Sequence, residues 1–125
     1  ALRQIKGIEP GLEVGLIVTA AVGDVSRTPA DFVSLNSARA TRSLVRRAHA
    51  AGKAVHVWTV NTPEVMLLML ERGVDNIITD DPALLARVIR DRAALSDSEK
   101  RALRLRVLFG KPPREAVDPE AVEVL

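Results

Sequence analysis

The feature that most constrains the fold of this chain is a sequence pattern that occurs twice in succession. In each copy a glycine precedes a short β-branched segment that ends in threonine and Asn or Asp, and a proline then opens an apolar helical segment. The two copies cover residues 52–63 and 73–82. Short aliphatic strands that alternate with helices are typical of a parallel sheet, because parallel neighbours need a crossover connection. The pattern therefore predicts an α/β fold with right-handed crossovers.

The rest of the chain fits the same organisation. Apolar segments predict strands over residues 12–18, 31–36, 53–59 and 74–79. Helical spacing and cap residues predict one helix that ends at Gly7 and four further helices over residues 41–51, 62–72, 81–92 and 96–109. The first of these strands is aliphatic on both faces, which is typical of a strand buried on both sides. A loop over residues 20–30 and a loosely held tail over residues 114–125 complete the expected order.

The last predicted helix has a clear start and an apolar side. Ser96 and Glu99 have the spacing of a capping box, which marks a helix N-terminus. An apolar stripe follows at helical spacing, formed by Ala102, Leu105, Leu108 and Phe109. We expect this stripe to cover another part of the protein.

Composition excludes several classes of function. The chain has 125 residues, of which 47% are hydrophobic, so it can form one domain with a buried core. Only 2% are aromatic and the 18 basic residues nearly balance the 16 acidic ones, which argues against a base-stacking surface and a nucleic-acid partner. The absence of cysteine excludes disulfides, thiolate metal sites and cysteine nucleophiles. No apolar run approaches the roughly 20 residues of a membrane-spanning helix.

Four segments resemble the glycerophosphodiester phosphodiesterase family. Residues 10–17 (PGLEVGLI) are similar to its fifth barrel strand, and residues 48–53 (AHAAGK) to the helix end before its seventh. Residues 57–61 (VWTVN) and 73–82 (GVDNIITDDP) match the seventh and eighth strands. The last two motifs are specific as an ordered pair, and the resemblance covers residues 1–92.

The resemblance implies a TIM-type (βα)8 barrel that hydrolyses glycerophosphodiesters to glycerol 3-phosphate and an alcohol, using a divalent metal such as Mg²⁺ or Ca²⁺. Residues 1–92 would form the C-terminal half of that barrel, strands five to eight, and residues 93–125 an additional helix and tail. The chain opens at Ala1 in what resembles a helix end, so we expect a missing N-terminal half barrel as its partner. This segment would complete the barrel and supply pocket walls for a small glycerophosphodiester.

The catalytic signature of the family cannot be placed on this chain. That signature is a His-Arg pair, a Glu-x-Asp metal motif, a further histidine and a Glu-x-Lys, all on earlier strands. Neither His-Arg nor Glu-x-Lys occurs here, and no Glu-x-Asp follows a strand end. Phosphodiester hydrolysis of this type needs carboxylates to hold the metal and an acid to protonate the leaving alkoxide. We therefore assign no catalytic or metal-binding residue, and we expect no bound metal and no activity in this segment alone.

Two residues are candidates for substrate binding. Trp58 ends the strand over residues 53–59, where its indole could form a pocket wall and present its N–H to a ligand. Asn61 follows the same strand and could bond substrate, although a role at the helix start competes with this interpretation. Asp80 and Asp81 precede Pro82, and capping of the next helix explains Asp81 without a metal.

Three further polar residues have structural interpretations. His56 alternates with valines, which places it against a helix or toward the barrel interior. His49 is expected to be a partly exposed helix residue, and Asp75 is expected to make a local turn bond after Gly73.

Two alternatives to the phosphodiesterase assignment remain. The chain could be a non-catalytic half barrel that associates with a second copy of itself, because exposed edges at its first and fourth strands favour pairing. Two copies could close an eight-stranded barrel through isologous contacts. It could also belong to another phosphate-handling α/β barrel that shares these strand endings by chance.

Overall fold

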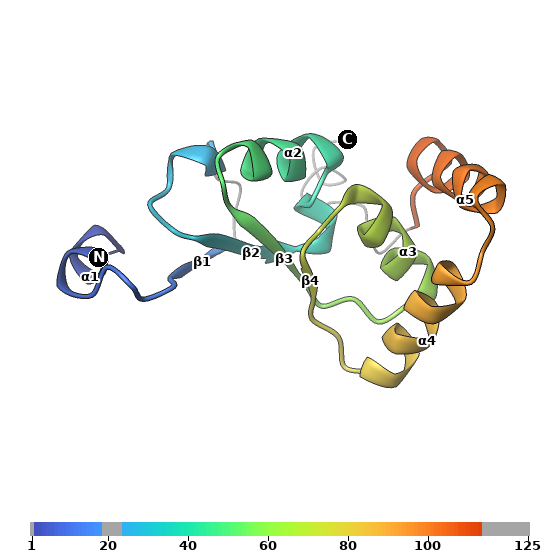
Figure 1. Cartoon of the computed structure of the whole chain (residues 1–125), viewed down its shortest axis with the longest axis horizontal. Helices are drawn as coiled ribbons and strands as arrows, with labels where there is room; N and C mark the ends of the chain where they lie inside the picture. Colours follow the sequence, from blue (N-terminus) through green and yellow to red (C-terminus); the bar gives the residue numbers. More distant parts are fainter. Residues whose placement is uncertain (1, 19–23, 114–125) are drawn as a thin grey trace, which may run out of the picture.

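The computed structural model describes residues 2–18 and 24–113, which form four strands and five α-helices (Figure 1). The strands are β1 (Gly15–Val18), β2 (Phe32–Asn36), β3 (Ala54–Trp58) and β4 (Asn76–Ile77). The helices are α1 (Leu2–Ile8), α2 (Arg42–Ala50), α3 (Pro63–Arg72), α4 (Pro82–Ala93) and α5 (Asp97–Phe109). Two short 3-10 turns, η1 (Val25–Arg27) and η2 (Ser37–Arg39), precede β2 and α2.

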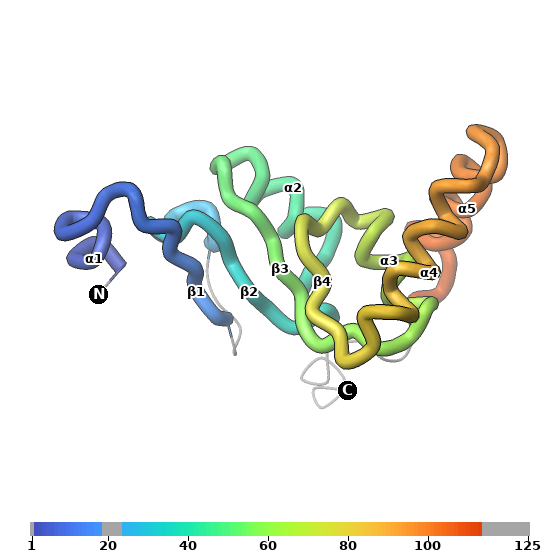
Figure 2. Tube along the Cα trace, turned by 60° about the horizontal axis from the view of Figure 1, so that its bottom comes forward, coloured from blue at the N-terminus to red at the C-terminus, as the bar shows by residue number. Residues whose placement is uncertain are grey.

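The strands form one parallel sheet in the order β1-β2-β3-β4, as the repeated sequence pattern predicts. Gly15 pairs with Phe32, and Phe32 pairs with Ala54. Because all four strands run in one direction, their carboxyl ends meet at one edge, which is the lower edge in Figure 2. The loops that follow β2, β3 and β4 therefore lie side by side (Figure 2).

The helices cover one face of the sheet and leave the other face open. Alternate strand residues form the buried core with α2 and α3; these strand residues are Val18, Val33, Leu35, Val55 and Val57. On the opposite face Ile17 is 69% exposed. The prediction that the first strand is buried on both faces is therefore wrong for the described residues, because the described helices pack against only one side of it.

Three predicted boundaries shift in the structure. Helix α1 continues through Gly7 to Ile8, so Gly7 is not its C-cap. Strand β1 begins at Gly15 because the N–H of Val14 donates to the Asp31 carboxylate at 2.7 Å instead of to a neighbouring strand. Strand β4 has two residues, although the Ile78 N–H still donates to the Val57 carbonyl at 2.8 Å just beyond it.

The start signals of the later helices are confirmed. Thr62 and Asp81 accept hydrogen bonds from the backbone of the first turns of α3 and α4, each of which opens with proline. Gly73 ends α3 in the left-handed conformation at φ 85°, which a residue without Cβ adopts at little cost. Ser96 and Glu99 form the predicted capping box of α5.

Helix α5 packs against α3, but not through the predicted stripe. Val107 packs against the core, whereas Leu105 is 61% exposed and Phe109 is 72% exposed. Among the described residues the expectation that this stripe covers another part of the protein is thus wrong. None of the described helices is long and apolar enough to cross a bilayer.

Candidate functional site at the carboxyl edge of the sheet

The last residues of β2 and β3 bring together two side chains that can form hydrogen bonds. Asn36 and Trp58 are register partners at the carboxyl ends of these strands. Because side chains alternate along a strand, both lie on the open face, away from the core formed by Leu35 and Val57. Trp58 is half-buried there. The structure thus places the predicted pocket-wall residue at the edge where parallel sheets bind ligands.

Asn61 joins the loop after β3 to the loop after β4. Its Nδ2 donates to Oδ2 of Asp80 at 2.9 Å, and its Oδ1 accepts from the Asp80 N–H at 2.9 Å and from Thr79 Oγ1 at 3.2 Å. These bonds use both lone pairs of Oδ1 and one of the two Nδ2 hydrogens. The role at the start of α3 that was the competing interpretation of Asn61 is filled by Thr62, whose Oγ1 accepts from the Val65 N–H at 3.4 Å.

The two aspartates of this edge are engaged in local structure. Oδ1 of Asp81 accepts from the Leu84 N–H at 3.0 Å, so its predicted capping role is confirmed. Asp80 is bonded to Asn61. Within the described residues no three His, Asp or Glu side chains come close enough together to hold a metal ion.

His56 lies on the open face of β3, away from the helix-covered core formed with Val55 and Val57, so the predicted orientation against a helix is wrong for the described residues. Its ring stacks on Phe32, with centroids 4.3 Å apart and planes 16° apart. Ser34, its register partner on β2, is buried beside it. These residues form a layer beneath Asn36 and Trp58, closer to the amino ends of the strands.

Asp75 does not make the predicted local turn bond. Its Oδ2 accepts from the Val55 N–H at 2.7 Å and lies 2.7 Å from Nε2 of His49. It therefore joins β3 to α2 at the amino edge of the sheet, away from Trp58. His49 is exposed on α2, close to the prediction.

Sequence reasoning missed three polar residues that shape the molecule, Asn36, Glu71 and Arg72. Asn36 caps η2, since its Oδ1 accepts from the Ala38 N–H at 2.9 Å, and an Asn as the last residue of a strand was the available signal. Glu71 is buried on α3 and accepts from Nε of Arg92 at 2.6 Å. Arg72 donates to the Ala40 carbonyl at 3.2 Å, and burial lowers the pKa of its guanidinium.

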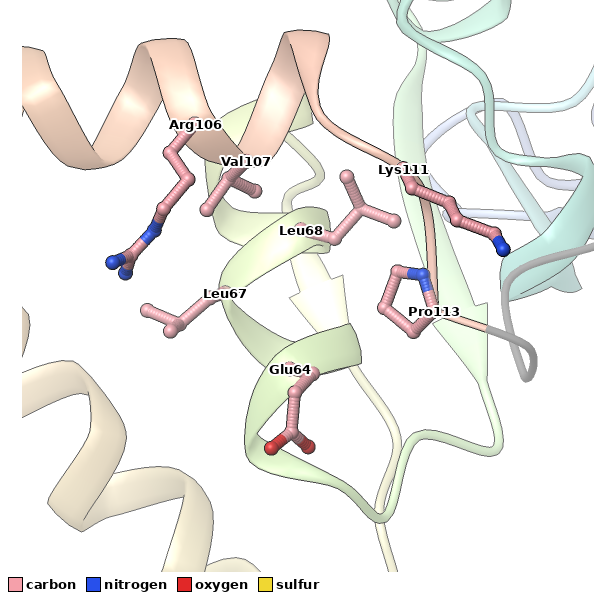
Figure 3. A pocket seen from close by; sticks show the side chains of 7 residues that line it. All are labelled: Glu64, Leu67, Leu68, Arg106, Val107, Lys111 and Pro113. Carbon is pink, nitrogen blue, oxygen red and sulfur yellow. The ribbon is translucent and has the colours of Figure 1, made fainter.

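A separate pocket of about 300 Å³ lies between α3 and α5 (Figure 3). Its floor is apolar, formed by Leu67, Leu68 and Val107, and its rim carries charged side chains. Figure 3 shows Glu64 on the rim at the start of α3, with Arg106 on α5 above it. The pocket lies in the helical layer and does not include Trp58 or Asn61.

Comparison with known sequences places residues 16–84 in the Glycerophosphoryl diester phosphodiesterase family. "Probable glycerophosphodiester phosphodiesterase 2" of Mycobacterium tuberculosis is 51% identical over 49 residues, which cover 39% of this chain and 19% of that protein. "Glycerophosphodiester phosphodiesterase" of Caldanaerobacter subterraneus subsp. tengcongensis is 31% identical over 94 residues, covering 72% of this chain and 39% of that protein. The chain thus spans well under half the length of these relatives.

Solved structures give the same result. A Silicibacter pomeroyi protein described as a glycerophosphoryl diester phosphodiesterase superposes with a TM-score of 0.65 at 26% identity, over 74% of this chain and 35% of that one. A phosphodiesterase of Oleispira antarctica, solved with the product sn-glycerol-3-phosphate, superposes with a TM-score of 0.62 over 72% of this chain and 38% of that one. At 21% identity the second likeness concerns the fold alone. With its four parallel strands and their helices matching about a third of such TIM-barrel structures, the chain belongs to the glycerophosphoryl diester phosphodiesterase family.

Proposed function

We propose that this chain supplies the C-terminal half of a TIM-type barrel, strands five to eight, in a metal-dependent glycerophosphodiester phosphodiesterase. The carrying observation is the open face of the sheet, on which Ile17 is 69% exposed, in a chain of this family. A parallel sheet normally has both faces covered, and in a barrel the inner face is filled by side chains from all eight strands. In this proposal residues 1–92 complete the barrel, and residues 93–125 add a helix and tail outside it.

The role of this segment would be to form one wall of the substrate site. The indole of Trp58 would contact the glycerol part of a glycerophosphodiester, and its N–H would donate to a substrate oxygen. Asn61 would donate its second Nδ2 hydrogen to the same ligand while its other bonds keep the two loops together. The Oleispira antarctica structure with sn-glycerol-3-phosphate supports this class of ligand for the fold.

The chemical step would depend on groups outside the described residues. Asp80 and Asp81 are bonded within their loop, and no group of three metal-ligating side chains occurs in the described part of the chain. These residues therefore do not fit a Mg²⁺ or Ca²⁺ site by themselves. We infer that the segment alone would not turn over substrate.

A self-associating half barrel is the second candidate, because the described sheet has two unpaired edges. Strand β1 pairs with β2 alone, and β4 pairs with β3 alone. Exposed strand edges promote association, and a second copy could close the sheet into an eight-stranded barrel. This candidate requires a stable dimer of the chain by itself.

One experiment separates the two candidates. The chain is expressed alone and within the complete reading frame that contains it, and both proteins are assayed for release of glycerol 3-phosphate from a glycerophosphodiester. We expect activity only from the complete protein, with Trp58→Ala raising KM more than it lowers kcat and Ile89→Ala, on the outer helix α4, changing neither. A stable dimer of the isolated chain, together with an inactive complete protein, would favour the half-barrel module.

A further inference from the structure

Helix α5 is strongly cationic over most of its length. From Lys100 to Lys111 the sequence contains five cations and no carboxylate; these cations are Lys100, Arg101, Arg104, Arg106 and Lys111. The family match ends at residue 84, so it does not account for this helix. Figures 1 and 2 show α5 at the end of the molecule opposite α1, as the outermost helix of that end.

The outer side of α5 also exposes two large apolar side chains. Leu105 is 61% exposed and Phe109 is 72% exposed, and residues four apart lie on the same face of a helix. Val107, which packs against the core, lies two residues from each of them, about 200° around the helix. The apolar pair therefore points away from α3 and forms a convex surface, not a groove.

Cations flank this apolar pair on both sides. Arg101 precedes Leu105 by four residues and lies about 40° from it around the helix, while Arg106 lies about 60° beyond Phe109 in the other direction. Both arginines are exposed, and Lys111 follows the helix end; Arg106 and Lys111 also border the pocket between α3 and α5, so their charged ends lie between that pocket and the outer side of the helix. An exposed apolar pair with an arginine on each side is typical of helices that lie in the interface of an anionic membrane.

A cationic hollow adjoins the same helix. It has a volume of about 310 Å³ and is lined by Glu71, Arg92, Asp97, Lys100, Arg101 and Arg104. Glu71 is bonded to Arg92, so the remaining three cations of the lining face the single carboxylate of Asp97. Arg101 belongs both to this hollow and to the flank of the apolar pair. The hollow can therefore receive a lipid phosphate beside the inserted side chains.

We propose that α5 docks this protein on the surface of a bilayer that contains anionic lipids. Leu105 and Phe109 enter the boundary between headgroups and acyl chains, and Arg101 and Arg106 contact the lipid phosphates. An anionic bilayer fits the combination of exposed apolar side chains with cations beside them, and RNA fits less well because only 2% of the chain is aromatic. The docking does not depend on the proposed phosphodiesterase activity.

The test is flotation of the full chain with vesicles. Vesicles of equal parts phosphatidylcholine and phosphatidylglycerol are compared with vesicles of phosphatidylcholine alone, at low and at high salt. We expect binding to the anionic vesicles alone, weakened by salt. The pair Arg101→Glu and Arg106→Glu lowers this binding by at least about tenfold, and so does the pair Leu105→Ser and Phe109→Ser, which leaves the charge unchanged.

The matched control is the pair Arg46→Glu and Arg47→Glu, which makes the same change in net charge on the exposed side of α2. We expect this control to retain most of the binding, and circular dichroism to show that all variants are folded. Three results would overturn the proposal. The first is an equal loss of vesicle binding in the α2 and α5 charge-reversal variants. The second is unchanged binding after Leu105→Ser and Phe109→Ser. The third is binding that is absent from the full chain but present after removal of residues 114–125. The last result would assign the surface to that acidic C-terminal segment.

Discussion

The Asn61 side chain makes two hydrogen bonds to Asp80, one with its carboxylate and one with its backbone N–H. Nδ2 of Asn61 donates to the Asp80 carboxylate, and the Asp80 N–H donates to Oδ1 of Asn61, both at 2.9 Å. The loops that follow two neighbouring strands are thereby fixed to each other at the carboxyl edge of the sheet. The same contact that leaves one Asn61 hydrogen for a ligand also sets the position of that hydrogen.

Asn61→Ala removes all three of these side-chain bonds, including that from Thr79. We expect a loss of about 1–2 kcal/mol in the free energy of unfolding, because the bonds are exposed and water replaces part of them. Urea denaturation measures this change. Asn76→Ala is the matched control, since Asn76 is exposed in β4 and makes no side-chain hydrogen bond among those described. An equal loss in both variants would show that the bridge contributes nothing beyond an ordinary surface amide.

Gly15→Ala tests the open face of the sheet. A Cβ at Gly15 would overlap the Phe32 ring, which stacks on His56. We expect the ring to be displaced and the free energy of unfolding to fall by about 1–3 kcal/mol. Gly11→Ala is the control, because nothing lies within 4 Å of its added Cβ. Thermal denaturation compares the two, and a neutral Gly15→Ala would mean that the Phe32 ring moves aside freely.

The order of strands and helices could be predicted from the sequence because the signals that mark the start and end of these elements are local. Gly73, Thr62 and Asp81 act within one turn of their own helices, and the structure confirms each of them as a cap. Trp58 was likewise placed at a strand end by its own segment, and the structure places it at the carboxyl edge. Whether it contacts substrate remains a prediction.

Apart from the cap formed by Asn36, the interactions that were missed join residues distant in sequence. Asp75 bonds to Val55 and His49, 20 and 26 residues away, which a turn propensity cannot indicate. Glu71 has the spacing of a surface residue and is buried only because α4 brings Arg92 to it. The prediction that the apolar stripe of α5 covers another part of the protein was wrong for a related reason. Helix α5 packs on α3 through Val107, which lies on a different side of the helix from the stripe.

Arg92→Ala and Glu71→Gln should differ in cost, although both change one ion pair. The Glu71 side chain is 2% exposed and that of Arg92 is 33% exposed. Removal of the arginine leaves a buried carboxylate without its cation, which we expect to cost about 3–5 kcal/mol in the free energy of unfolding. Glu71→Gln keeps an acceptor for Nε and should cost about 1–2 kcal/mol.

Arg90→Ala, an exposed residue of the same helix, is the control for the loss of an arginine from α4 and should change stability by less than about 0.5 kcal/mol. Urea denaturation at constant pH orders the three variants. A cost for Arg92→Ala no larger than that for Arg90→Ala would contradict the assignment of this pair as the link between α3 and α4.

The capping box of α5 makes part of the stability depend on pH. Hydrogen bonds from Ser96, its side chain first and its backbone N–H second, lower the pKa of Glu99 from its ordinary value of 4.5. The carboxylate is therefore favoured in the folded state, so its contribution is complete above pH 4.5 and is lost as the pH falls through the lower folded-state pKa.

Thermal denaturation at a series of pH values measures this contribution as the difference in Tm between the unsubstituted protein and Glu99→Gln. Glutamine can still accept from the Ser96 N–H but does not titrate in this range. We expect the difference to be constant above pH 4.5 and to shrink below it. A difference that grows as the pH falls would mean that the protonated form of Glu99 is the one that caps α5.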